Sequence, residues 1–180
     1  MPTLKAVIFV AWIVFWVYWL ISAAGAKQGS RTWRTRPPGL MILVLGFVLL
    51  RVFRPGTLAV HNSIVQGVGM VLFASGLGLA VWARIYIGQN WGMPMTEKDE
   101  PELVTSGPYH FVRHPIYAGV LLAILGTSLA TNVYWLIAFA VLGAYFIYSA
   151  KVEERLLTSS FPGEYQRYRT NSKMLIPFVL

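Results

Sequence analysis

Two histidines, an arginine and two tyrosines stand together at the start of an apolar segment of near-membrane length. They occupy residues 107–119, which read GPYHFVRHPIYAG. A charged side chain at membrane depth is costly, so residues of this kind are functional candidates by default. Arg113 and His114 are therefore the first candidates for a binding or catalytic site.

A pair of glutamates supplies the opposite charge at the end of a later apolar segment. Glu153 and Glu154 follow the apolar residues 133–150, and only two residues separate that segment from the apolar residues 115–130. So short a connection predicts a tight hairpin of two helices. The hairpin would bring Glu153 back to face the Arg-His pair across a pocket.

The predicted pocket suits a ligand that carries several charged groups. Arginine binds a carboxylate through two parallel hydrogen bonds, a glutamate attracts an ammonium group, and an aromatic face attracts a cation such as a sulfonium. S-adenosylmethionine carries all three groups, and these residue types permit this ligand without selecting it. The aromatic lining would come from Tyr109, Tyr117, Tyr165 and Tyr168.

Two other spacings have simpler interpretations. The third apolar segment contains two GxG pairs, at 67–69 and 76–78. A dinucleotide-binding fingerprint needs a strand, a turn and a helix start around its glycines. Inside an apolar helix, small residues instead allow close helix packing.

The histidines do not predict a metal site. His110 and His114 are four residues apart, a spacing that can place two metal ligands on one helix face. Pro115 interrupts helical continuity at that point, and no third ligand is apparent. We therefore expect no metal, and we expect His61 to be a solvated loop residue.

The composition is that of a polytopic membrane protein. Of the 180 residues, 56% are hydrophobic and 12% are charged, whereas a soluble domain carries about 25% charged residues. There is no cysteine, which excludes disulfides and thiolate chemistry. We expect an all-α integral membrane protein whose C-terminal helix forms a cofactor pocket. Its five predicted transmembrane helices are 4–24, 39–53, 64–83, 115–130 and 133–150.

Charge distribution predicts the orientation. The net charge is +8, but the basic residues flank apolar segments, which argues against a nucleic-acid-binding face. All but three of the fifteen lysines and arginines fall on one side of the predicted bundle; the exceptions are Lys5, Arg51 and Arg54. The positive-inside rule then puts the N-terminus outside, and the active site and C-terminus in the cytoplasm.

Several blocks in the second half of the chain resemble one known family. They are LVTSGPY at 103–109, RHPIY at 113–117, EERLL at 153–157 and Ile-Pro at 176–177, with Gly119, Gly126-Thr127, Asn132, Phe161, Tyr165 and Tyr168 between them. In this order and spacing they resemble the isoprenylcysteine carboxyl methyltransferase family and its phospholipid methyltransferase relatives. The resemblance covers residues 103–177.

The resemblance implies a membrane methyltransferase that uses S-adenosylmethionine and takes a lipophilic methyl acceptor from the bilayer. It divides a single membrane domain, 1–180, into N-terminal helices at 1–87 and a methyltransferase-like core at 88–180. The implied cofactor contacts are Leu103, Val104, Tyr109, His114, Pro115, Tyr117 and Glu153.

The acceptor and its activation stay open at this stage. Methyl transfer is an in-line displacement that requires the acceptor atom close to the methyl carbon. A thiol or a protonated amine must also lose a proton, for which His110 and Glu154 are the nearest bases. Arg113 would hold the cofactor carboxylate or position the acceptor. Family members that methylate a prenylcysteine carboxylate have an arginine where this chain has Ser149.

Two further hypotheses belong to other classes of protein. A membrane reductase of sterol-reductase-like architecture would bind NADPH, whose phosphates call for more basic residues than this pocket offers. A non-catalytic membrane scaffold would leave the polar pocket unexplained.

Overall fold

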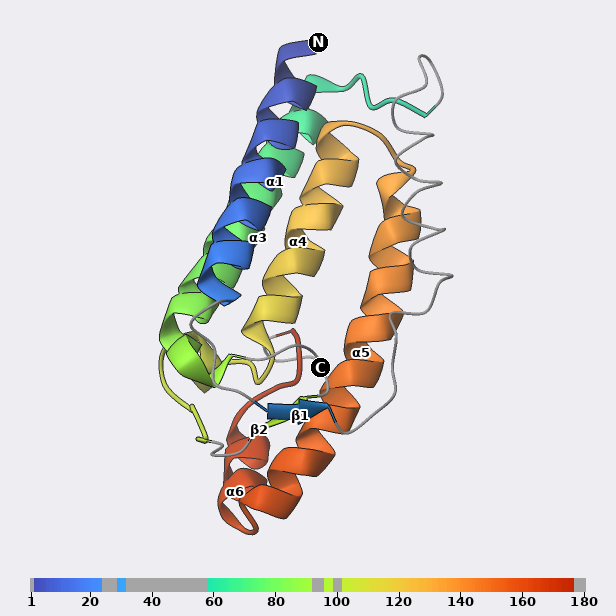
Figure 1. Cartoon of the computed structure of the whole chain (residues 1–180). Coiled ribbons are helices and arrows are strands. Elements are labelled where there is room, and N and C mark those ends of the chain that lie inside the picture. Colours follow the sequence, from blue (N-terminus) through green and yellow to red (C-terminus); the bar gives the residue numbers. More distant parts are fainter. Residues whose placement is uncertain (1, 24–28, 32–57, 92–95, 99–101, 177–180) are drawn as a thin grey trace.

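The long apolar runs of the sequence form helices that lie side by side (Figure 1). The structure is a computed structural model, and it describes residues 2–23, 29–31, 58–91, 96–98 and 102–176. Among these residues, three helices are long and apolar enough to cross a membrane, and a further apolar helix, α4, is shorter. The helices are α1 (Pro2–Ala23), α3 (Ser63–Ile87), α4 (Pro115–Ala130), α5 (Trp135–Ser160) and the polar α6 (Glu164–Asn171).

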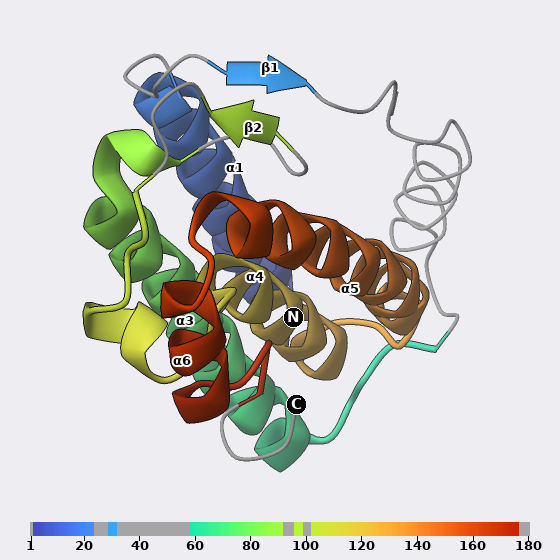
Figure 2. The same ribbon diagram turned by 90° about the horizontal axis from the view of Figure 1, so that it is seen from below.

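This arrangement confirms the all-α membrane architecture. The predicted helix at 115–130 has the same bounds as α4, and the predicted segment 39–53 lies outside the described residues. Two three-residue strands, β1 (Gly29–Arg31) and β2 (Thr96–Lys98), pair in antiparallel register. They lie at the same end of the molecule as α6 (Figure 1), and the view from below shows the strands and α6 apart from each other (Figure 2).

Local sequence signals explain where the helices begin and end. The Asn62 side chain caps α3, because its Oδ1 accepts the backbone N–H groups of Ile64 at 2.9 Å and Val65 at 3.2 Å. Proline occupies the first position of α4, where its missing N–H costs nothing. The helix α5 runs ten residues past the predicted end of its apolar segment, to Ser160, because no helix breaker precedes Pro162.

Helices α3 and α4 pack closely and antiparallel through glycines spaced seven residues apart. A Cβ added to Gly69 would lie 2.5 Å from the Ala130 nitrogen, and one added to Gly76 would lie 2.4 Å from the Ala123 nitrogen. Opposite them on α4, Gly126 is equally constrained. Small residues thus let the two backbones touch, as predicted. The interpretation holds for one glycine of each GxG pair, since Gly67 and Gly78 have open space around them.

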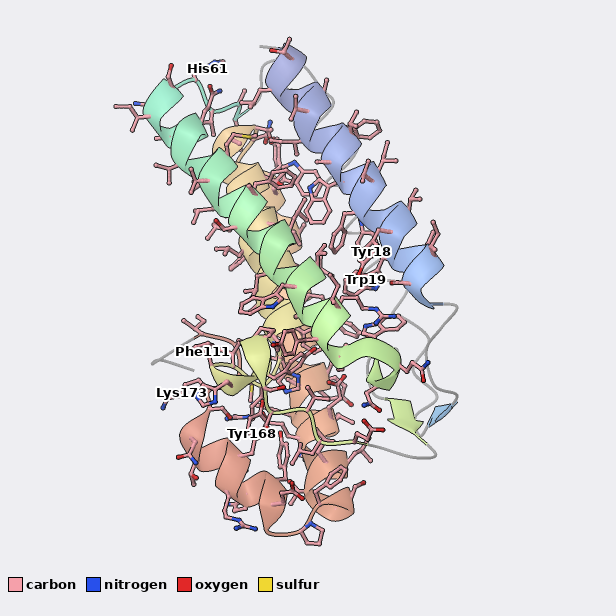
Figure 3. The ribbon with its side chains drawn as sticks, turned by 90° about the vertical axis from the view of Figure 1, so that its left-hand side faces the viewer. Tyr18, Trp19, His61, Phe111, Tyr168 and Lys173 are labelled. Carbon is pink, nitrogen blue, oxygen red and sulfur yellow. The ribbon has the colours of Figure 1, made fainter. Side chains whose placement is uncertain are left out.

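Helix α1 runs parallel to α3 (Figure 3). Hydrogen bonds hold α1 to the bundle at its middle and near its C-terminal end. The Trp12 indole N–H donates to Thr127 Oγ1 at 3.1 Å. Near that C-terminal end, buried Arg84 donates to the carbonyls of Ser22 at 2.5 Å and Gly88 at 2.7 Å. Its guanidinium also stacks 4.9 Å from the ring centre of Trp91. The first bond ties the middle of α1 to α4, and the bonds of Arg84 hold the end of α3 beside the end of α1.

The predicted hairpin between α4 and α5 is present. Asn132 is fully buried, and its Oδ1 accepts the backbone N–H of Tyr134 at 2.9 Å. That turn delays the start of α5 to Trp135, two residues later than the sequence predicted. Because the connection is short, α5 must return beside α4, and its C-terminal half reaches the start of α4.

Candidate active site

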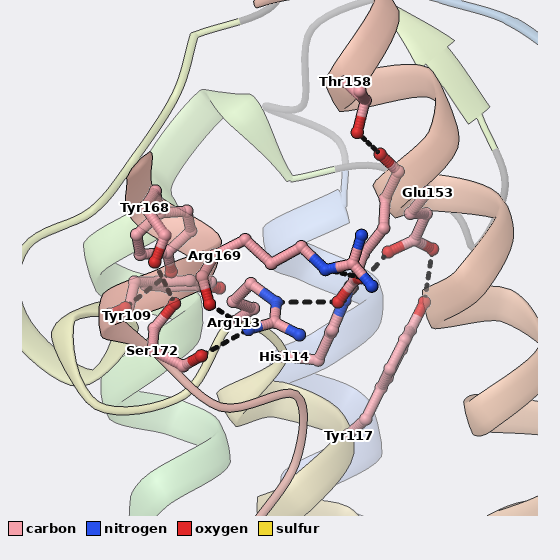
Figure 4. A network of polar contacts seen from close by, with 10 residues as sticks. Tyr109, Arg113, His114, Tyr117, Glu153, Thr158, Tyr168, Arg169 and Ser172 are labelled. Atoms are coloured by element: carbon pink, nitrogen blue, oxygen red, sulfur yellow. Dashed lines mark hydrogen bonds and ion pairs between the residues drawn. The ribbon is translucent and has the colours of Figure 1, made fainter. Parts of the chain in front are cut away.

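Five segments meet at one end of the bundle and build a cluster of polar side chains (Figure 4). They are the 3-10 turn η2 (Gly107–His110), the residues that lead from it into α4, the first turn of α4, the C-terminal half of α5, and α6 with the segment that follows it. The charged members of the cluster come from α5, α6 and the residue pair that precedes α4.

Arg113 and Glu154 form the buried ion pair at the centre of this cluster. The Arg113 Nε donates to Glu154 Oε1 at 2.7 Å, and the two side chains are 8% and 7% exposed. Arg113 Nη1 also donates to the backbone carbonyls of Ser172, in a short bond, and of Arg169, at 3.3 Å. Arg113 therefore ties α5 and the α6 segment to the start of α4.

His114 lies between the two glutamates. Its Nδ1 is 3.4 Å from Glu153 Oε2 and its Nε2 is 3.5 Å from Glu154 Oε1, and the side chain is 7% exposed. Burial alone would lower the pKa of His114, but hydrogen bonding and attraction from the two carboxylates outweigh burial and raise it. The imidazole is accordingly biased toward its charged form.

Glu153 is held in a different way from its neighbour. The Tyr117 hydroxyl donates to Glu153 Oε1 at 2.6 Å, and the Glu153 side chain is 24% exposed. The Tyr117 ring is stacked between the rings of His114, at 5.4 Å, and Phe146, at 4.4 Å, each at an interplanar angle of 5°. Ring stacking thus fixes the hydroxyl that orients this carboxylate.

Three further tyrosines surround the cluster. The Tyr168 hydroxyl donates to the backbone carbonyl of Tyr109 at 2.5 Å, and the Tyr109 hydroxyl is 3.4 Å from the Ala83 carbonyl. Burial raises the pKa of Tyr168 to about 12 and raises the pKa values of Tyr109 and Tyr165 further. These hydroxyls stay neutral near pH 7, and those of Tyr109 and Tyr168 donate hydrogen bonds to backbone carbonyls.

The chain after α6 closes onto the segment before α4. Val112 and Lys173 form a parallel bridge. The backbone N–H of Arg113 donates to the Lys173 carbonyl at 2.7 Å, and that of His114 donates to the Met174 carbonyl at 3.1 Å. These bonds hold the Arg-His backbone in place, and no sequence pattern indicated them.

The structure brings most of the predicted site residues together. Tyr117, His114, Arg113 and both glutamates are joined by the contacts above. Tyr109 is attached through Tyr168, and Pro115 begins α4. Leu103 and Val104 are half-buried in the segment that leads to η2.

Two features of the predicted site differ from the structure. The sequence predicted that Glu153 faces both Arg113 and His114; Glu153 does lie beside His114, but Arg113 pairs with Glu154 instead. His110 is exposed, and among the described residues its contact is an edge-to-face approach to the ring of Phe111 at 5.2 Å. Of the two predicted bases, Glu154 is in a salt bridge, and His110 has no bond to the cluster in the described part of the chain.

Some residues of the site were not found from the sequence. The Ser172 carbonyl is a backbone group, which residue type cannot reveal. Arg169 approaches Glu154 Oε2 at 3.7 Å from an exposed position. Phe146 stands two turns before Glu153 on α5, and this helical spacing was the signal that could have identified it.

Apolar helices packed around a buried charge cluster at one end define a polytopic membrane protein with a polar site close to the membrane boundary. A family model described as phospholipid methyltransferase matches residues 64–164, more than half of the chain. The chain therefore belongs to the phospholipid methyltransferase family, and the resemblance found in its sequence motifs is confirmed.

Two curated relatives and one solved structure illustrate this membership. Protein-S-isoprenylcysteine O-methyltransferase B of Arabidopsis thaliana is 31% identical over 144 residues, covering 78% of this chain and 72% of the relative. Methanethiol S-methyltransferase of a Pseudomonas species is 30% identical over 149 residues, covering 76% and 56%. A eukaryotic intramembrane Ras methyltransferase, isoprenylcysteine carboxyl methyltransferase, has the same fold, with a TM-score of 0.63, 21% identity, and coverage of 81% and 55%. The chain spans about half the length of several curated relatives that it matches.

Proposed function

We propose that this chain is an integral-membrane methyltransferase that uses S-adenosylmethionine and acts on a lipophilic small molecule. The observation that carries the proposal is the buried cluster of Arg113, His114, Tyr117 and two glutamates, in a chain of the phospholipid methyltransferase family. A scaffold would have no use for buried charges that are so costly to desolvate.

The residues of the cluster fit such a cofactor. Six buried polar atoms of the described residues have no hydrogen-bond partner, and two of them, His114 Nε2 and Tyr165 Oη, belong to the cluster. Buried polar atoms of this kind normally have partners, so a polar ligand fits here. Glu153 is the more exposed of the two glutamates, and its charge suits an ammonium or a sulfonium group.

Each residue has a proposed part in binding. Glu153 attracts the cationic groups of the cofactor, and His114 and Tyr117 hold that carboxylate in position. Leu103, Val104, Tyr109 and Pro115 provide walls that exclude water, which strengthens electrostatic interactions inside the site. When bound, S-adenosylmethionine supplies an electrophilic methyl group.

Arg113 and Glu154 act in this proposal by positioning the other residues. Arg113 already donates to a carboxylate and two carbonyls, so it has little capacity left for a ligand carboxylate. These existing hydrogen bonds of Arg113 also argue against NADPH binding, because the phosphates of NADPH require free cationic donors. The proposed base role of His110 stays a prediction, and the base role of Glu154 is disfavoured by its ion pair.

We place the site at the cytoplasmic face, with the N-terminus outside and residues 1–180 forming one membrane domain. The excess of lysine and arginine at the end that contains the site supports the orientation. The tight packing of α3 against α4 supports a single domain, because these helices fall on either side of residue 88.

Calorimetric titration of the purified full chain with S-adenosylhomocysteine, and separately with NADPH, tests the proposal. We expect saturable binding of S-adenosylhomocysteine alone. Binding of NADPH alone would indicate a reductase, and binding of neither by a folded protein would indicate a scaffold.

A further inference from the structure

One face of α5 leads from the middle of the bilayer-length helix to the candidate site. Phe146, Ser149 and Glu153 follow one another at three- and four-residue spacing, so they share one side of the helix. Phe146 stacks on Tyr117 at 4.4 Å, and the Tyr117 hydroxyl donates to Glu153. This face of α5, which we name the Phe146–Glu153 face, therefore looks toward α4 at the site.

Ser149 at the middle of this face has an unused hydrogen-bonding group. Its side chain is 0% exposed, and its hydroxyl has no hydrogen-bond partner in the described part of the chain. A helical serine ordinarily donates to the carbonyl four residues earlier, and a buried hydroxyl without a partner is unfavourable. Ser149 therefore has one hydrogen bond to give to a ligand.

The cations of the site have partners of their own, and the most exposed of them, Arg169 on α6, lies 3.7 Å from Glu154 Oε2. Arg113 donates to Glu154 and to carbonyls of the α6 segment, and His114 lies between the two glutamates. Lys151 is exposed and, two residues from Ser149, lies on the opposite side of α5. Over the ranges that the structure describes, no lysine or arginine of α5 therefore belongs to the Phe146–Glu153 face.

This distribution of charge discriminates between chemical classes of acceptor. A carboxylate acceptor must give up its hydration and needs charged donors in return. A sulfur nucleophile is larger and more polarisable, so it is satisfied by an aromatic wall and a single weak hydrogen bond. The Phe146–Glu153 face offers the second environment.

We infer that the methyl acceptor is a lipophilic thiol, whose sulfur is received by Ser149 and Phe146. This inference rests on the proposed methyltransferase function. A lone pair of the thiol sulfur forms the new carbon–sulfur bond, and the bond between the methyl carbon and the donor sulfur breaks, leaving its electron pair on that sulfur. The thiol proton departs to solvent, to which the partly exposed Glu153 provides a path.

The test compares acceptors on the purified full chain in lipid nanodiscs. Transfer of labelled methyl groups from S-adenosylmethionine is measured with octanethiol, with octylamine and with N-acetyl-S-farnesylcysteine, which presents a carboxylate. We expect the thiol to be methylated at least about 100-fold faster than the other two. Faster methylation of the carboxylate or the amine, or no methylation of the thiol, overturns the inference.

Measuring the binding of S-adenosylhomocysteine distinguishes failure of the thiol inference from failure of the proposed methyltransferase function. If S-adenosylhomocysteine binds and only the carboxylate is methylated, the thiol inference fails while the methyltransferase proposal stands. If S-adenosylhomocysteine does not bind and no acceptor is methylated, both fail.

A second test concerns Ser149 itself. Ser149→Ala should raise the KM for octanethiol about two- to tenfold, the effect of one lost hydrogen bond, without changing the affinity for S-adenosylhomocysteine. Ser160→Ala removes an exposed serine from the end of the same helix and should change neither quantity. An unchanged KM for octanethiol in Ser149→Ala would show that the Ser149 hydroxyl does not contact the acceptor.

Discussion

Adjacent glutamates of this site have different partners, and the difference assigns them different roles. Glu154 is bonded to Arg113 and is 7% exposed, whereas Glu153 is held by Tyr117 and is 24% exposed. Removing one member of a buried ion pair leaves the other charge uncompensated and costs about 3–5 kcal/mol. In the proposed function, Glu154 is therefore the structural residue and Glu153, the more exposed of the two, is the one that meets the cofactor.

Charge removal at the two glutamates should therefore have different effects. Glu153→Gln should weaken S-adenosylhomocysteine binding about 10- to 100-fold, the effect of losing a charge-assisted interaction, with little change in thermal stability. Glu154→Gln should mainly lower the unfolding temperature. Calorimetry and thermal unfolding in detergent measure the two effects.

Glu164→Gln, at the exposed start of α6, serves as the control for charge removal and should leave both quantities unchanged. Equal loss of binding and of stability in both Glu153→Gln and Glu154→Gln would contradict the division of roles.

The raised pKa of His114 makes the stability of the site depend on pH. The folded-state pKa lies above the ordinary value, so the stabilisation is fully present below about pH 6.5 and is lost as the pH rises through the folded-state pKa. The groups that face the imidazole are Glu153, Glu154 and the ring of Tyr117. We expect the unfolding temperature to fall as the pH is raised from about 6.5 through that pKa, and to fall less in His114→Gln. A wild-type protein whose stability rises over this range would show that the imidazole is neutral.

At the scale of elements, glycine contacts between α3 and α4 position the site. The two helices touch backbone to backbone, and α4 carries His114 and Tyr117 at its start. Any increase in the distance between the helices would move the start of α4 relative to α5. Packing inside the bundle and the geometry of the charge cluster are coupled in this way.

Alanine substitutions at two glycines should change stability in opposite directions. A Cβ at position 126 would lie 2.3 Å from the Phe73 nitrogen, so Gly126→Ala should destabilise the protein by about 1–3 kcal/mol through overpacking. Gly67 has nothing within 4 Å, so Gly67→Ala should be neutral or should stabilise by about 0.5–1 kcal/mol through helix propensity. Thermal unfolding of both variants measures the difference, and equal effects would rule out the close contact.

At the scale of the whole molecule, the two ends of the bundle differ in the charged residues that they carry. The site, α6 and the small sheet lie at one end, and the N-terminus lies at the other (Figure 1). The apolar surfaces of α1, α3 and α5 lie between these ends and are suited to lipid contact. In the proposed function, a cofactor from the cytoplasm and an acceptor from the bilayer would approach the site by different routes.

Absence of cysteine makes the orientation directly testable. Single substitutions His61→Cys and Thr170→Cys place a thiol at exposed positions at opposite ends of the chain's helical bundle. In intact cells we expect a membrane-impermeant maleimide to label His61→Cys only, and in inverted vesicles to label Thr170→Cys only. The reverse pattern would place the site outside the cytoplasm.

The sequence by itself determined the helices, the hairpin and the residue types of the site. Helix formation depends on local apolar length and on local signals such as Asn62 and Pro115, so the bounds of α4 could be predicted. Helix α5 begins two residues later than its predicted apolar segment, because of the turn, and continues beyond that segment to Ser160. The motif blocks identified the family because their order and spacing are written along the chain.

Only the tertiary structure decided how those residues are paired. Consecutive residues of a helix point about 100° apart, so whether Glu153 or Glu154 faces Arg113 depends on the rotation of α5 about its axis. That rotation is set by packing against α4, which no local pattern encodes. The carbonyls of Ser172 and Lys173 likewise reach the site only through the return of the chain after α6, because a backbone acceptor is present at every residue and acquires a specific role from position alone.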